Sequence, residues 1–172
     1  MIRSFRGITP RIGENSYIDE SAVVIGDVEI GANCSIWPLT VIRGDSNRIR
    51  IGDDTNIQDG SVLHVTHDGE FSPGGAPLEI GSQVTVGHKV LLHGCRIGNQ
   101  CLIGMGSIVA DNAVVEDRVM IGSGSQVPPN KVLESGYLYL GNPVVQKRPL
   151  RDRELEFLTY VADHYVLLKQ SY

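Results

Sequence analysis

A six-residue repeat of aliphatic residues runs through most of the chain, and it restricts the possible folds more than any other feature. Ile, Val or Leu recurs at every sixth position in four runs. The runs are Ile12, Ile18, Val24, Ile30, Ile36 and Ile42; Ile51, Ile57 and Leu63; Ile80, Val86 and Leu92; Ile97, Ile103, Val109, Val115, Ile121 and Val127. This period fits no α-helix and no two-layer sandwich. It fits a β-helix in which each hexapeptide forms one short strand and one corner.

Grouping the repeat positions in threes predicts six triangular coils, which begin at residues 12, 30, 51, 80, 97 and 115. Every break in the spacing then falls at the same corner of the triangle. The longest break, at about 66–77, is rich in Gly and Ser and predicts a loop that projects from this corner. We therefore expect an all-β solenoid over residues 1–145.

The last part of the chain, residues 146–172, changes to helical spacing. Apolar residues there predict a helix from about Asp152 to Lys169, with Asp152 as its N-cap. The apolar stripe consists of Leu155, Leu158, Val161, Ala162, Tyr165 and Leu168. We expect this stripe to pack along the β-helix or against a neighbouring subunit.

The composition agrees with this fold and excludes several classes of function. Aromatic residues make up only 6% of the chain, and Gly occurs 20 times, which suits a prism too narrow for rings and corners that need small residues. A net charge of −5 without a basic block argues against nucleic acid as a partner. No apolar run reaches the ~18 residues of a membrane span. Three cysteines (Cys34, Cys95 and Cys101) are too few for a disulfide framework, so we expect packing roles and a cytoplasmic location.

Two histidines occupy equivalent positions in successive coils. His64 directly follows the repeat residue Leu63, and His93 directly follows Leu92. They should therefore stack at one corner, about 4.8 Å apart along the coil axis. Arg43 follows Ile42 and belongs to the same column one coil earlier. The two imidazoles are candidates for binding one metal ion together.

A third histidine, His88, lies two residues after Val86 and so belongs to another face. Asp59 precedes it by one coil in the same column, with Gln58 beside it. In a trimer of prisms, His88 of one chain could meet His64 and His93 of the next. Three imidazoles and an open fourth position describe a catalytic zinc site. The alternative is that these histidines simply lie on a solvated face, as we expect for His164.

Four segments together carry a more specific pattern: Arg43–Asp45, Asn56–His64, Val86–Gly94 and Ile103–Gly106. They resemble the γ-class carbonic anhydrases, and especially the bacterial YrdA-type proteins of that class. The resemblance covers essentially the whole chain. It implies a left-handed parallel β-helix and a homotrimer. It also implies zinc, or another divalent metal such as iron or cobalt, at each of three interfaces.

The same resemblance assigns roles to individual residues. It makes His64, His88 and His93 the metal ligands, and it places Arg43, Asp45, Gln58 and Asp59 around them or at the interface. The implied enzyme is a zinc-dependent lyase, in which metal-bound hydroxide converts carbon dioxide to bicarbonate. Tyr137 is a further candidate for this site.

One position departs from the family pattern. The founding enzymes have a glutamate proton shuttle three residues after the first ligand, and this chain has His67 there. Histidine can carry protons, but the replacement argues against fast turnover. Two alternatives stay open because a fold does not determine a function. One is an acyltransferase or thioesterase acting on acyl-CoA, and the other is a non-catalytic trimeric scaffold that keeps the metal.

Overall fold

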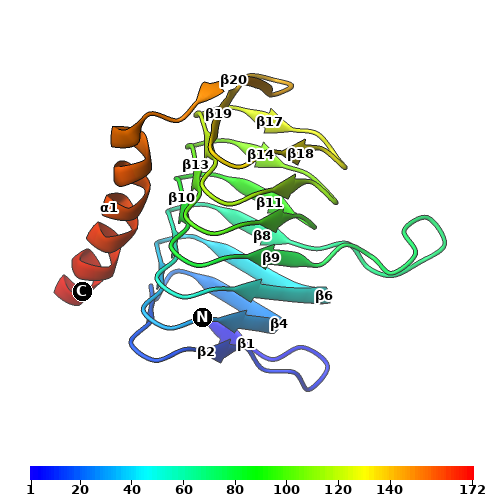
Figure 1. Cartoon of the computed structure of the whole chain (residues 1–172). Helices are drawn as coiled ribbons and strands as arrows, with labels where there is room; N and C mark the ends of the chain where they lie inside the picture. Colours follow the sequence, from blue (N-terminus) through cyan, green and yellow to red (C-terminus); the bar gives the residue numbers. More distant parts are fainter.

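The computed structural model describes residues 1–172, and the chain winds into the predicted parallel β-helix with three faces (Figure 1). The first face contains β2 (Arg11–Ile12), β9 (Leu78–Ile80), β12 (Arg96–Ile97), β15 (Val114–Val115) and β18 (Val132–Leu133). The second face contains β3 (Tyr17–Ile18), β5 (Ser35–Ile36), β7 (Asn56–Ile57), β10 (Thr85–Val86), β13 (Leu102–Ile103), β16 (Met120–Ile121), β19 (Tyr137–Leu140) and β20 (Val145–Pro149). The third face contains β1 (Ile2–Arg3), β8 (Val62–His64), β11 (Leu91–His93), β14 (Ile108–Val109) and β17 (Gln126–Val127).

Two long strands join the third face to the first. β4 (Val23–Ile30) and β6 (Val41–Ile51) begin on the third face and continue around the corner onto the first. For this reason β6 pairs with β8 through Ile42 and with β9 through Ile51. The breaks in the six-residue spacing lie at this corner, as predicted. We call it the broken corner, and we call the corner between the second and third faces the regular corner.

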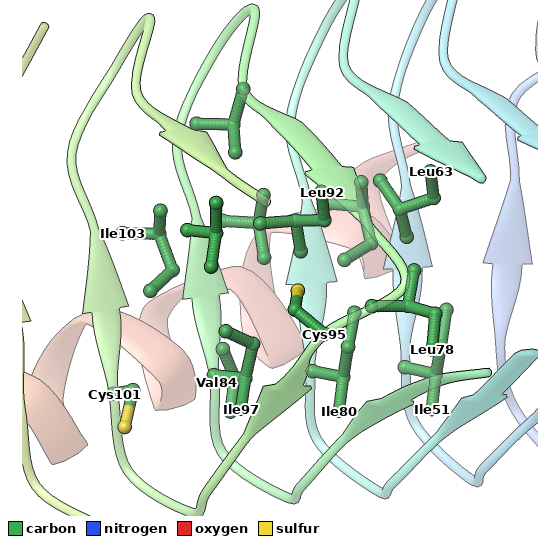
Figure 2. Packing of buried hydrophobic residues seen from close by; sticks show 14 of the residues in the cluster. Ile51, Leu63, Leu78, Ile80, Val84, Leu92, Cys95, Ile97, Cys101 and Ile103 are labelled. Atoms are coloured by element: carbon green, nitrogen blue, oxygen red, sulfur yellow. The ribbon is translucent and has the colours of Figure 1, made fainter. Parts of the chain in front are cut away.

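The repeat residues fill the prism in columns, as Figure 2 shows for Ile51, Ile80 and Ile97. All sixteen repeat positions from Val24 to Val127 are at most 4% exposed. Full burial of such a side chain stabilises the fold by about 1.5–3 kcal/mol. The stacked aliphatic side chains therefore supply most of the hydrophobic stabilisation of the solenoid.

The repeat continues beyond the predicted sixth coil. Leu133 and Tyr139 are also buried, and their strands pair with β15 and β16. The expectation that the prism excludes rings is wrong at this end. Tyr139 is only 2% exposed, and its hydroxyl oxygen accepts the Glu134 backbone N–H at 2.7 Å. An aromatic ring fits in the last coil because no further coil has to stack upon it.

The glycines that follow repeat positions serve a purpose other than turning the chain. Gly31 has an ordinary φ, but a Cβ there would lie 2.7 Å from the backbone nitrogen of Asp53 in the next coil. The positive φ values at the corners between the first and second faces belong to other residues, such as Asn33 (57°) and Asp54 (55°). Asn and Asp tolerate this conformation better than most residues. Glycine is needed here because successive coils approach closely.

The helix α1 (Asp152–Leu168) lies along the second face and contacts β7 and β10 (Figure 1). Leu158 and Ala162 of the predicted stripe are buried. The Tyr165 ring packs edge-on against Trp37 at 5.6 Å. A short 3-10 turn, η1 (Lys169–Ser171), completes the chain. The helix is too short and too polar to cross a membrane.

The predicted N-cap is wrong by one residue. Arg151 has extended backbone angles and is the N-cap, while Asp152 is the first helical residue. Glu154 caps the start of the helix instead, because its carboxylate accepts a hydrogen bond from the Arg151 backbone N–H at 2.8 Å. The same carboxylate binds both terminal nitrogens of Arg148 at 2.7 Å. These contacts tie α1 to β20.

Candidate metal centre

His64 and His93 lie side by side at the broken corner. β8 and β11 pair in register, so His93 is aligned with His64 as the coil count predicts. Nδ1 of His64 is 3.1 Å from Nε2 of His93, and the ring centroids are 5.1 Å apart. Two ligands of a tetrahedral zinc ion with Zn–N bonds of about 2.0–2.1 Å are themselves about 3.3 Å apart. The spacing of these two nitrogens therefore fits two ligands of one ion.

Each ring of this pair is also fixed by a carboxylate. Nε2 of His64 lies 3.1 Å from Oδ1 of Asp45, and Nδ1 of His93 is hydrogen-bonded to Oδ1 of Asp111. An ionised carboxylate only accepts hydrogen bonds, so each ring uses its N–H there. The two nitrogens that face each other then both present lone pairs. A cation between them would relieve this repulsion, and carboxylates behind histidines are typical of metal sites.

Arg43 controls the charge of Asp45. Burial alone would raise the pKa of Asp45, but hydrogen bonds from Arg43, His64 and Ser46 outweigh it and lower this pKa to about 2. Burial is also the main cause that lowers the pKa of His64, and the nearby Arg43 charge adds to it. Both shifts favour an ionised Asp45 and a neutral His64. A neutral imidazole is the form that binds a metal.

His88 lies at the regular corner, two residues after the end of β10. Its Nδ1 is 2.9 Å from Oδ2 of Asp59 in the previous coil, so the predicted column is present. The His88 side chain is 46% exposed. Within one chain, no three His, Cys, Asp or Glu side chains are arranged so that they could hold a metal ion. One chain therefore presents a pair of candidate ligands and a single one at separate corners.

The remaining candidate residues take different positions. Gln58 is buried and donates to Oδ1 of Asn56 at 3.1 Å, rather than contacting a histidine. His67 is exposed at the start of the projecting loop. Tyr137 lies in β19, three strands from β10 in the same sheet, and packs against the core. Arg43 forms its ion pair with Asp45 within the chain.

Two residues at the broken corner were absent from the sequence-based prediction. Asp111 contacts His93, and its second oxygen accepts the Thr66 hydroxyl at 2.6 Å. A signal for Asp111 was present in the sequence, because it follows His93 by one coil period of 18 residues. Thr66 had no such signal, since it lies in the loop where the period is interrupted.

The outward side chains differ strongly between the first and third faces. On the first face they are charged in most coils: Arg11, Glu29, Arg50, Glu79 and Arg96. On the third face the corresponding positions are apolar in all coils but the last: Val23, Val41, Val62, Leu91 and Ile108, followed by Gln126. Val62 and Ile108 are 39% and 38% exposed. An apolar strip therefore runs between the two corners that carry the histidines.

Comparisons with known proteins agree with the hexapeptide-repeat fold. Residues 9–44 and 94–129 match the family described as "Bacterial transferase hexapeptide (six repeats)". The chain is 59% identical over its full length to Protein YrdA of Escherichia coli, covering 94% of that protein. It is 41% identical over its full length to a carbonic anhydrase of Geobacillus kaustophilus, covering 91% of it.

A solved structure extends this likeness. The hexapeptide transferase family protein from Anaplasma phagocytophilum has a TM-score of 0.93 and 38% identity, with 100% of this chain and 98% of that chain covered. Fold and sequence thus define a hexapeptide-repeat solenoid protein. Within that class, the chain belongs to the γ-carbonic anhydrase-like family of YrdA-type proteins.

Proposed function

We propose that this protein is a γ-carbonic anhydrase-like metalloenzyme that hydrates carbon dioxide at the interfaces of a homotrimer. His64 and His93 of one copy and His88 of the next are the proposed ligands of zinc or another divalent metal. The observation that carries the proposal is the pair of facing nitrogens, 3.1 Å apart, in rings whose other nitrogens are bound to carboxylates. This donor set suits a divalent cation.

The apolar strip on the third face supports the trimer. Val62 and Ile108 are exposed between two polar corners, and a second copy would cover them. Placing the third faces around a threefold axis brings the broken corner of one copy to the regular corner of the next. His88, which has no metal-binding partners in its own chain, would then complete the site.

The chain's own residues would orient the site and handle the proton. Zinc, when bound, would lower the pKa of its water toward neutrality and so supply the nucleophile. Asp45 and Asp59 fix the rings of His64 and His88, and Arg43 keeps Asp45 ionised. His67 lies exposed three residues after His64, where its imidazole can pass a proton to solvent.

Metal analysis combined with stopped-flow carbon dioxide hydration tests the proposal. We expect stoichiometric metal in the wild-type trimer, and loss of both metal and hydration in His64→Ala and in His93→Ala. His164→Ala, at an exposed position on α1, is the matched control and should keep both. Metal-replete wild-type protein that hydrates carbon dioxide no faster than buffer would exclude the enzymatic activity. In that case a trimeric scaffold that keeps the metal becomes the better explanation.

An acyltransferase or thioesterase acting on acyl-CoA is the second candidate. It is favoured by the Anaplasma relative, which is described as a hexapeptide transferase family protein. Such an enzyme needs a base but does not need two adjacent imidazoles backed by carboxylates. Calorimetric titration with acetyl-CoA distinguishes the two functions, because the metalloenzyme should give no binding heat.

A further inference from the structure

Asp111 makes two contacts that join His93 to the projecting loop. Its Oδ1 is hydrogen-bonded to Nδ1 of His93 in the previous coil. Its Oδ2 accepts the Thr66 hydroxyl at 2.6 Å. Both partners donate, so the carboxylate is a shared acceptor between a ring and a loop. Asp111 is the only hydrogen-bond partner of Nδ1 of His93 within the chain.

Thr66 is itself held firmly at the base of the loop. Its backbone pairs with Ala76 in both directions at 3.0 Å, which closes the loop like the end of a hairpin. Its carbonyl oxygen also accepts the Asn47 side-chain amide at 3.1 Å. Gly75 packs so closely here that a Cβ would meet the Thr66 carbonyl and Asn47. The Thr66 hydroxyl is therefore a fixed donor toward Asp111.

We propose that Asp111, held by Thr66, is the positioning residue that sets the tautomer and ring orientation of His93. With the proton fixed on Nδ1, Nε2 keeps its lone pair directed at His64. The inference rests on the proposed function for its consequence in metal binding, but the tautomer itself can be measured without any metal. Asp111 serves His93 as Asp45 serves His64 and as Asp59 serves His88. Each candidate ligand thus has its own carboxylate.

Nuclear magnetic resonance of metal-free, 15N-histidine-labelled protein tests the proposal directly. Long-range 1H–15N spectra report which ring nitrogen carries the proton, and the His93 signals are those lost in His93→Gln. We expect the Nδ1–H form of His93 in the wild type and loss of its predominance in Asp111→Ala. Asp111→Asn keeps an acceptor oxygen and should change the spectrum less. Thr66→Val should shift it in the same direction as Asp111→Ala.

A matched control is Asp117→Asn. Asp117 is also a corner carboxylate that binds the neighbouring coil, at the Asn99 backbone N–H, but it touches no histidine. This variant should leave the His93 signals unchanged. The proposal is overturned if His93 keeps the same tautomer in folded Asp111→Ala as in the wild type, or if Asp117→Asn alters it as much.

Zinc affinity, measured by competition with a chromophoric chelator, then links the tautomer to the site. We expect Asp111→Ala to bind zinc 10–100-fold more weakly than the wild type, the usual effect of removing a carboxylate behind a ligating histidine. Because both residues act through one contact, adding Thr66→Val should weaken binding no further. Equal affinities in wild type and Asp111→Ala would overturn the role of Asp111 in metal binding. Wild-type protein that binds no zinc would instead refute the proposed function, while the tautomer result would stand.

Discussion

The broken corner and the regular corner are built from the same repeat but contain different chemistry. At the regular corner the spacing never changes, and successive turns are joined by short side-chain hydrogen bonds such as those from Thr40 and Ser61 to backbone carbonyl groups. At the broken corner, β4 and β6 run through the bend, the loop projects, and side chains from four successive coils meet around His64 and His93. The breaks after Ile42 and after Leu63 bring Asp45 to His64 and Thr66 to Asp111, whereas Asp111 itself reaches His93 from a coil of regular spacing. The comparison teaches that the regular repeat builds the prism and aligns the histidines, and that its interruptions add further contacts around them.

The largest effect on metal content and activity should be seen when chains with a damaged broken corner and chains with a damaged regular corner are mixed in one trimer. His64→Ala damages the broken corner and His88→Ala the regular one, so each pure trimer should lack metal and activity. Mixed trimers, isolated by two different affinity tags, should regain one intact site. At one of their three interfaces, the undamaged broken corner of a His88→Ala chain meets the undamaged regular corner of a His64→Ala chain. Metal content and hydration rate per trimer measure this gain. Mixed trimers as inactive as the pure ones would contradict a site shared between copies.

The next effect, on the oligomeric state, should differ between the two faces that meet at the broken corner. Leu91→Glu places a charge on the apolar strip of the third face, so we expect the trimer to dissociate. Glu79→Gln removes a charge from the outward side of the first face and should leave the trimer intact, although it weakens an exposed ion pair with Arg48. Analytical ultracentrifugation measures both. A trimeric Leu91→Glu variant would show that copies do not meet through this face.

A smaller effect, on the free energy of unfolding, distinguishes the neighbouring residues Leu63, which lies in the prism, and His64, which lies in the candidate site. Leu63 is fully buried, whereas His64 beside it points toward the corner. Leu63→Ala should lower the free energy of unfolding by about 2–5 kcal/mol, because it removes core contacts and leaves a cavity. His64→Ala should cost much less in metal-free protein. Denaturant unfolding of both variants without metal provides the measurement, and equal losses would refute this division of roles.

The smallest effect concerns the helix that covers the second face next to the regular corner. Arg148 and the Arg151 backbone lower the pKa of Glu154 from 4.5 to about 2. Since the folded state binds this proton less readily, the stabilisation is complete above pH 4.5 and is lost as the pH falls toward 2. Glu154→Gln should therefore lower the melting temperature slightly at pH 7 and not at all near pH 2. Melting curves across this range test it, and a pH-independent difference would contradict the ion pair.

The repeat made most of the fold predictable, because a buried column tolerates few residue types. Every predicted repeat position from Val24 to Val127 is in the core, and the alignment of His64 with His93 follows from counting coils. The end of the solenoid was harder to predict. Tyr139 keeps the period but not the residue type, since the last coil has different neighbours.

The candidate site was only half predictable for a similar reason. Asp59 and Asp111 are each one coil from the histidine they contact, so the period of the repeat relates both pairs. Thr66 reaches Asp111 from a loop whose path depends on Asn47 and Ala76. No periodicity determines that path. Contacts between a repeat and the loops that interrupt it therefore cannot be derived from the period of the repeat.

The way the upper end of the solenoid is closed has a consequence for assembly in cells. A stack of parallel strands could in principle grow without limit by adding another chain at its open end. Here β20 turns back and pairs antiparallel with β19, and the Tyr139 ring occupies the last layer of the prism. On the second face, an incoming parallel strand therefore meets an antiparallel strand and an aromatic ring in place of a parallel strand and an aliphatic column. This cap disfavours end-to-end stacking of copies into fibres, because all three faces must be continued at once and one of them is blocked.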